Sequence, residues 1–243
     1  HALWSVGCFA GAGLFSILAK LGLGISQIAI IHCIIIFMII FAFSRYFLPY
    51  KGASNGKAIA IPKGIVTLFG VLAVISFLGE GGMMDWSGVF LTEAKGVDLS
   101  LAGVGYAVFS AAMLIGRLIG DKVVQKLGEQ RVVIFGGIVA SVGYIISIVF
   151  DNFFMMQFGF ILLGFGAANI VPVVFTLLGR QKEMPINSAV TAVTSMGYLG
   201  VMFGPALLGF IAHGIGIVAV FCILAGMFIL QAIVSSYVFK VLN

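Results

Sequence analysis

The stretch "GIVTLFGVLAVISFLGEGGMMDWSGVFLT", residues 64–92, decides the fold class. It is almost entirely apolar and is longer than the roughly 20 residues that a helix needs to cross a bilayer. The rest of the chain is similar, because 62% of its 243 residues are hydrophobic and only 9% are charged. A soluble domain cannot hide that much apolar surface, since its folded form still needs a polar exterior. The sequence therefore predicts a protein that crosses the membrane several times.

Apolar stretches of similar length recur along the chain, bounded by charged residues, prolines or turn residues. They are predicted at residues 1–19, 25–47, 64–92, 101–121, 131–150, 153–179, 188–212 and 215–240. Lipid cannot satisfy backbone hydrogen bonds, so these segments must be helices. We expect an all-α polytopic bundle of about eight spans. The polar stretch 48–63 is predicted to be a linker between two helices (1–47) and six (64–243).

The basic residues indicate the orientation of the bundle. One side receives eleven of them: Arg45, Lys51, Lys57, Lys63, Arg117, Lys122, Lys126, Arg131, Arg180, Lys182 and Lys240. The other side receives only Lys20 and Lys95. Cytoplasmic loops carry the excess of Lys and Arg, so we expect both ends of this chain to lie in the cytoplasm and the protein to lie in the cell (inner) membrane. Because the basic residues are scattered along the chain between apolar segments, no nucleic acid is expected as a partner.

A basic segment follows the fourth predicted span: "GRLIGDKVVQKLGEQR", residues 116–131. Gly116 and Gly120 form a GxxxG step, which lets two helix backbones approach closely in lipid. Asp121 and Lys122 are expected to end the helix at the cytoplasmic surface. An ordinary packing helix followed by a basic loop would by itself explain this segment.

The same segment resembles the cytoplasmic signature of the major facilitator superfamily, in which a Gly, then an Asp with a basic neighbour, precede another Gly and further basic residues. Five residues separate Lys122 from Gly128 here, where the compact signature has one. The stretch "GEGGMMDWSGVFL" resembles the seventh helix of a fucose-permease-like bacterial branch, and "HALWSVGCFAGAGLF" resembles the fifth.

This resemblance implies that the eight spans are helices five to twelve of twelve, with 48–63 as the central cytoplasmic loop and the first four helices missing. It implies a secondary active transporter of a sugar or similar small polar metabolite, with a proton as a candidate coupling ion. The cytoplasmic gating motif would then comprise Gly116, Arg117, Gly120, Asp121 and Lys122.

Two polar residues occupy matching positions in corresponding spans. Glu80 and Asn169 each lie sixteen residues past the predicted start of their span, about 24 Å into the membrane at 1.5 Å per residue. Glycines flank Glu80, and glycines and Pro172 flank Asn169. Polar, interrupted positions in repeated segments are the best sequence pointer to a transport site. We therefore expect the helix to unwind locally at Glu80.

An ionisable group at this depth costs several kcal/mol unless it faces water, a partner or a proton. No Lys or Arg is expected at the depth of Glu80, so an ion pair is not predicted. The sequence predicts a carboxylate that faces a water-filled cavity, and the alternative is a protonated packing residue. Glu80 could bind substrate, carry a proton or do both. Ser76 and Ser87 share its helix face, although back-bonding or packing explains such serines equally well. Asp85 lies one to two turns further along and could instead be a solvated residue.

The sequence contains no spacing typical of a metal site, a disulfide or a nucleophile with its base. We therefore expect no cofactor, no metal and no enzymatic activity. His32 and His213 lack a carboxylate at i±4 and are predicted to be structural, with a place in the cavity as the alternative for His32. A non-transporting scaffold or sensor of the same fold, and an integral-membrane enzyme, are the alternative functions. The expected partners are a small polar solute, the lipid bilayer and protons.

Overall fold

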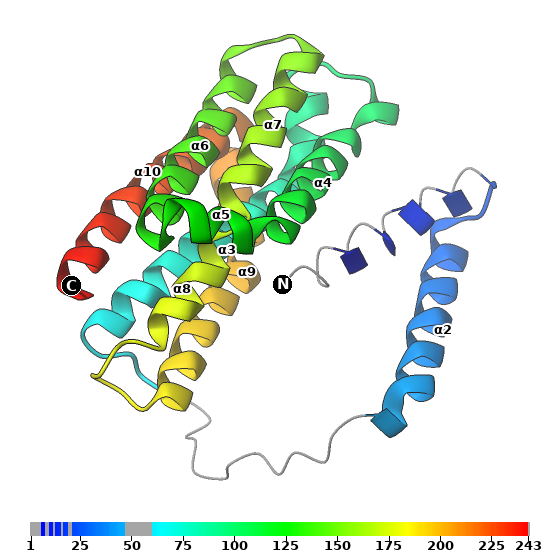
Figure 1. The fold of residues 1–243 in the computed structure, drawn as a ribbon. Coiled ribbons are helices and arrows are strands. Elements are labelled where there is room, and N and C mark those ends of the chain that lie inside the picture. Colours follow the sequence, from blue (N-terminus) through cyan, green and yellow to red (C-terminus); the bar gives the residue numbers. More distant parts are fainter. Residues whose placement is uncertain are drawn as a thin grey trace. The chain divides into compact units, whose positions relative to one another are not determined.

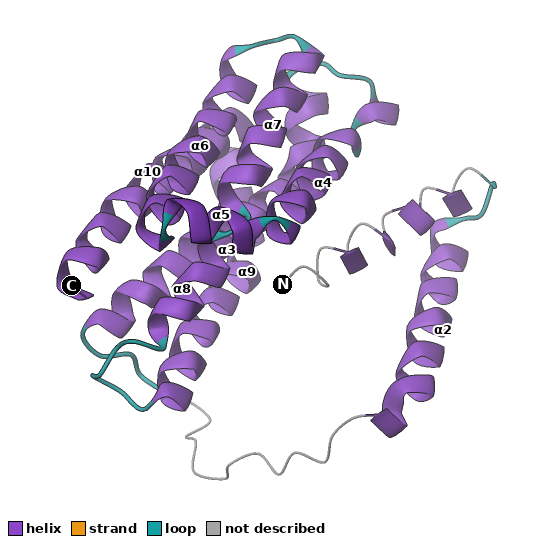
Figure 2. Cartoon of the chain, viewed as in Figure 1, coloured by secondary structure: helices purple, strands orange, loops and turns teal. Residues whose placement is uncertain are grey.

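The computed structural model describes residues 21–46 and 60–242, together with residues 6–7, 10–11, 13–15 and 17–18. Every regular element in these ranges is helical (Figures 1 and 2). The elements are α2 (Ile25–Phe43), the 3-10 turn η1 (Ser44–Tyr46), α3 (Ile65–Val89), the π-helical turn η2 (Phe90–Ala94), the 3-10 turn η3 (Leu99–Leu101), α4 (Val104–Leu118), α5 (Gly120–Leu127), α6 (Glu129–Val149), α7 (Phe153–Ala167), α8 (Ile170–Leu178), α9 (Ile186–Ile215) and α10 (Ile217–Leu242). The predicted all-α class is confirmed.

Six of the described helices are long and apolar enough to cross a membrane. They are Ile25–Tyr46, Ile65–Ala94, Glu129–Val149, Phe153–Leu178, Ile186–Ile215 and Ile217–Leu242. The predicted span 101–121 corresponds to the shorter apolar helix α4 and the start of α5. Most of the predicted span 1–19 and of the linker 48–63 lies outside the described residues.

The chain divides into two compact units, residues 3–56 and residues 57–243. The first holds α2. The second holds α3 to α10, which pack into one bundle around a continuous apolar core. Within this bundle, α6 and α7 run antiparallel with their backbones in close contact. A Cβ on Gly143 would lie 2.5 Å from the carbonyl oxygen of Gly159, and one on Gly136 would lie 2.6 Å from that of Gly166. Both pairs are seven residues apart, so they lie on one face and hold the two helices together.

The glycines of α3 also make room for neighbouring helices. A Cβ on Gly79 would meet the ring of Phe228 at 2.5 Å, and one on Gly82 would meet Leu224 at 2.6 Å, both on α10. Helix α3 therefore stays regular from Ile65 to Val89. The predicted local unwinding at Glu80 is wrong, because these glycines accept α10 side chains in close packing and do not loosen the helix.

The two ends of the bundle differ in charge. Glu183, between α8 and α9, accepts a hydrogen bond from the backbone N–H of Ile65 (3.1 Å), and Arg180 pairs with Glu129 at the start of α6 (2.7 Å). The first turns of α3 and α6 therefore share an end with the α8–α9 connection. Basic residues gather there: Lys63, Arg131, Arg180, Lys182 and Lys240, with Lys122 and Lys126 on α5, which leads into α6. Lys95, paired with Asp151 (2.6 Å), lies at the opposite end.

Candidate functional site

Two helix breaks lie next to each other inside the bundle. The first separates α7 from α8 at Ala168 and Asn169. Pro172 explains it, because proline has no N–H to donate to the carbonyl four residues earlier, that of Ala168. The second break, at Ile119, separates α4 from α5. The Nδ2 group of Asn169 donates to the carbonyl oxygen of Gly116 (3.0 Å) and so joins the two breaks.

The GxxxG step forms the contact between these breaks. A Cβ on Gly116 would lie 2.7 Å from the Cβ of Ala168, and one on Gly120 would collide with Oδ1 of Asn169. Glycine is required at both positions because any side chain would force the two breaks apart. The close helix approach predicted from the spacing is present, and its partner is the interrupted helix α7–α8.

Arg117 connects this region to Glu80. Its Nη2 donates to both carboxylate oxygens of Glu80, at 2.9 and 3.1 Å, and its Nε donates to the carbonyl oxygen of Ala168 at 3.3 Å. The latter oxygen is the one that Pro172 leaves without a helical partner. The Arg117 side chain is 4% exposed and that of Glu80 is 19% exposed. One guanidinium therefore links α3, α4 and the α7–α8 break.

The expectation that no Lys or Arg lies at the depth of Glu80 is wrong. Arg117 was placed at the cytoplasmic end of its span, but α4 has only 15 residues and ends at Leu118. Such a helix is about 22 Å long, shorter than the roughly 30 Å hydrocarbon core. Arg117 therefore lies within the length of the bundle and its charge is not a surface charge. One feature of the sequence indicates this depth: the apolar run that ends in Arg117 is short, and Gly120 follows three residues later.

The predicted serines lie in the bundle interior. The Ser76 hydroxyl donates to the carbonyl oxygen of Leu72 (3.0 Å) and to Oε1 of Gln231 on α10 (3.5 Å), and the residue is fully buried. Ser87 is 1% exposed. Neither serine reaches the Glu80–Arg117 pair, so the structure gives Ser76 a packing role between α3 and α10.

The remaining predicted residues are exposed. Asp85 lies on α3 beyond Glu80, on the exterior of the bundle. Asp121 and Lys122 lie in the first turn of α5, also exposed. A carboxylate in the first turn interacts favourably with the helix dipole, so Asp121 is suitably placed at its own helix N-terminus. Within the described residues the structure shows no ion pair for Asp121 or Lys122.

The geometry thus brings Glu80 and Asn169 together through Arg117. A carboxylate, a guanidinium and an amide lie close together inside a largely apolar bundle, where two of its helices are interrupted. In a membrane protein, an intramembrane ionisable pair marks a substrate or ion pathway by default. Together the fold and this site define a polytopic membrane protein with an ion pair inside its bundle.

Comparisons with known proteins identify the family. The family model of the Major Facilitator Superfamily matches residues 69–242. An uncharacterized MFS-type transporter of Yersinia pestis is 43% identical over 216 residues, 88% of this chain and 56% of that protein. The membrane protein MosC of Rhizobium meliloti is 30% identical over 150 residues, 62% of this chain and 37% of that protein. An uncharacterized transporter of Sinorhizobium fredii is 29% identical over 219 residues, 88% of this chain and 57% of that protein.

The chain belongs to the Major Facilitator Superfamily. It spans about half the length of the curated relatives that cover most of it. The resemblance seen in the sequence is confirmed at the level of the superfamily.

Proposed function

We propose that this chain is part of a secondary transporter that moves a small polar solute, a sugar or a similar metabolite, across the membrane by alternating access. The observation that carries the proposal is the Glu80–Arg117 pair at the level of the two helix breaks. Removing two charges from water costs several kcal/mol per ion, which is repaid only in part by their attraction. An apolar packing residue would cost less at both positions, so the pair favours a functional role over packing.

The two charged side chains of the pair differ in exposure, and this difference indicates which of them contacts the solute. Glu80 is the more exposed partner, and a carboxylate accepts hydrogen bonds from hydroxyl groups. Arg117 balances its charge from the buried side. This arrangement favours a neutral hydroxylated solute over an anion, which Glu80 would repel. Asp85, exposed on the same helix, is the proposed next contact along the path, and Asn169 is proposed to position the two breaks.

The packing suggests how this pair could take part in alternating access. Helix α3 packs extensively on α9 and α10, whereas α4 packs extensively on α7. Direct contact between α3 and α4 is much smaller, and the Glu80–Arg117 pair spans it. Helix α6 packs extensively on both α7 and α10 and so joins the two helix groups. A proton on Glu80, or hydroxyl groups that compete for its oxygens, would therefore loosen the local link between α3 and α4.

The charge difference between the bundle ends supports an orientation with the α8–α9 connection in the cytoplasm. In this orientation both chain ends are proposed to be cytoplasmic, in the cell membrane. The stretch 48–63 is proposed to be the central loop between two halves, and four further helices of the intact protein would complete the transport path. Asp121 and its neighbours are proposed to act at the cytoplasmic gate.

The test uses the intact transporter in proteoliposomes with a panel of radiolabelled solutes. The variant is Glu80→Gln, which keeps the shape and one acceptor but removes the charge. We expect at least a tenfold lower uptake, about 1.4 kcal/mol. If Glu80 binds substrate, exchange and gradient-driven accumulation fall together; if it carries the coupling proton, only accumulation fails.

The matched control is Glu129→Gln, which removes a carboxylate from an ion pair with Arg180 at the end of the bundle. It should transport normally. Wild-type uptake and accumulation by Glu80→Gln would refute the proposed role of the pair.

A further inference from the structure

A cavity at the end of the bundle away from the basic loops is lined by acidic, aromatic and aliphatic side chains. It measures about 730 Å³ and lies between α3–η2 and the turn that joins α9 to α10. Glu93 and Trp86 line it from α3–η2, and His213 lines it from the last turn of α9. Glu93 lies thirteen residues beyond Glu80, about 20 Å further along the helix. The cavity is therefore separate from the proposed transport site.

Local backbone features build this cavity. Helix α3 continues into the π-helical turn η2, and its residues Trp86, Val89 and Glu93 line the same wall. Gly209 of α9 admits the indole ring, since a Cβ there would lie 3.2 Å from it. Gly216, with φ of +91°, makes the tight turn between α9 and α10 that forms one wall of the cavity.

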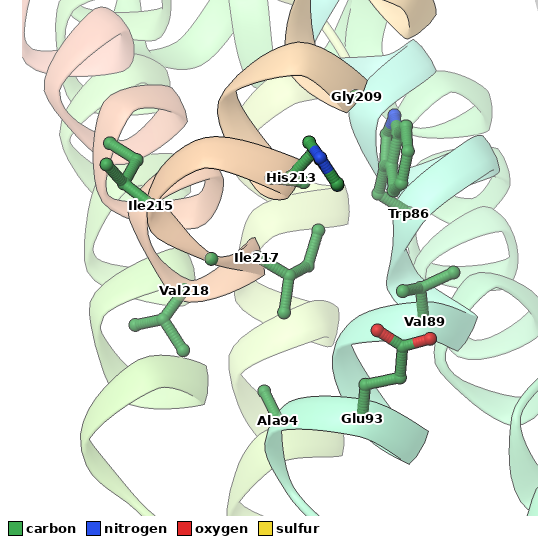
Figure 3. A pocket seen from close by; sticks show the side chains of 11 residues that line it. Trp86, Val89, Glu93, Ala94, Gly209, His213, Ile215, Ile217 and Val218 are labelled. Atoms are coloured by element: carbon green, nitrogen blue, oxygen red, sulfur yellow. The ribbon is translucent and has the colours of Figure 1, made fainter.

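The polar groups of the cavity face a common space. Figure 3 shows the carboxylate of Glu93 and the ring of His213 directed into it, with Val89 and Ile217 between them. The indole Nε1 of Trp86 is buried and has no hydrogen-bond partner among the described residues. The other lining residues are aliphatic or glycine.

The net charge of the cavity is set by Glu93. Among the described lining residues there is no Lys or Arg. Lys95, two residues further on, is directed to the other side: its Nζ donates to Asp151 and to the carbonyl oxygen of Ile148, both at 2.6 Å. It therefore does not neutralise Glu93. His213 offers a ring nitrogen that can accept a hydrogen bond.

We propose that this cavity binds the ammonium head of a small organic cation. The Glu93 carboxylate supplies the counter-charge, the Trp86 ring supplies a face that attracts cations, and the aliphatic walls accommodate methyl or methylene groups. An anion is disfavoured because, in the part of the chain that the structure describes, Glu93 is the only acidic or basic lining residue apart from His213. A sugar is disfavoured because few lining groups can bond to several hydroxyls. The same chemistry fits a soluble alkylammonium solute and the amine headgroup of phosphatidylethanolamine.

The experiment measures binding of radiolabelled choline to the intact transporter by equilibrium dialysis in detergent. We expect saturable binding that Glu93→Gln weakens at least tenfold and that Glu93→Asp, which keeps the charge, largely retains. Trp86→Leu should weaken it several-fold. Asp98→Asn is the control, because it removes a carboxylate close in sequence that does not line the cavity. Acetate should not compete.

Repeating the assay in nanodiscs separates the two sources of the ammonium group. Choline binding that is suppressed in phosphatidylethanolamine and present in phosphatidylglycerol assigns the site to the lipid headgroup. Equal binding in both assigns it to a soluble cation. The absence of saturable choline binding in detergent, or binding that Glu93→Gln leaves unchanged, would overturn the proposal.

Discussion

The Glu80–Arg117 pair makes a quantitative prediction about stability through a double-mutant cycle. The single variants are Glu80→Gln and Arg117→Met, and the double variant carries both. Removing one partner of a buried ion pair costs about 3–5 kcal/mol, because the other charge is left uncompensated. Here the value should be smaller. Glu80 is 19% exposed, and glutamine keeps one acceptor for the guanidinium. We expect Glu80→Gln to cost about 2 kcal/mol.

The two single substitutions destabilise the protein for different reasons. Arg117 cannot lose its proton, so Glu80→Gln leaves a charge that is 4% exposed. Arg117→Met leaves the Glu80 carboxylate without its partner, but this group can take up a proton. It also removes the hydrogen bond from Nε to the Ala168 carbonyl oxygen, to which Pro172 has no N–H to donate. An unsatisfied buried acceptor costs about 1–3 kcal/mol. The double variant removes both charges, so only the unsatisfied Ala168 carbonyl oxygen still lowers its stability. Its loss of unfolding free energy should therefore be about 1–3 kcal/mol smaller than the sum of the losses of the two single variants.

The assay is thermal unfolding of the purified intact transporter, followed by scanning fluorimetry. A chain of the length of the curated relatives should lose roughly 1–2 °C in Tm per kcal/mol, so Glu80→Gln should melt about 2–4 °C lower. The control Glu129→Gln breaks a pair whose arginine side chain is 59% exposed, and exposed pairs contribute less than about 1 kcal/mol. Additive effects of the two single substitutions would refute the inference that the pair is coupled.

Three further substitutions test the packing and the bundle ends. Gly143→Ala should destabilise the protein by about 1–3 kcal/mol because its Cβ would meet the backbone of α7, whereas Gly226→Ala, with open space around it, should be neutral or stabilising by thermal unfolding. Glu183→Gln should cost about 0.5–2 kcal/mol and speed hydrogen exchange at the first turn of α3, and unchanged exchange there would contradict the cap. Asp121→Asn should lower the transport rate in proteoliposomes while substrate affinity stays nearly constant, and normal uptake would argue against a gating role.

The fold class was predictable from the sequence because lipid imposes a simple rule. A helix that crosses a bilayer needs about 20 apolar residues, whatever its neighbours are. The run 64–92 meets this rule without reference to the rest of the chain. The GxxxG step at Gly116 and Gly120 was also recognisable from its spacing, although the break at Ile119 places Gly116 on α4 and Gly120 on α5.

The role of the glycines around Glu80 depended on tertiary packing. In the sequence they look like helix-loosening residues. In the structure Gly79 and Gly82 receive side chains of α10, and α3 remains a regular helix. Both arrangements use glycine, and a neighbouring helix that lies more than 140 residues away in the sequence decides between them.

The partner of Glu80 was likewise settled only by the tertiary structure. A carboxylate in an apolar run could be recognised from the sequence as costly, and hence as a candidate site. Its neighbour Arg117 lies 37 residues away. The depth of that arginine depends on where α4 ends, and α4 ends early because the chain bends at Ile119 beside the break that Pro172 imposes on α7–α8. Hydropathy measures how long a run is along the chain. The depth of one side chain relative to another depends on how the helices pack, and here that packing brings Arg117 to Glu80.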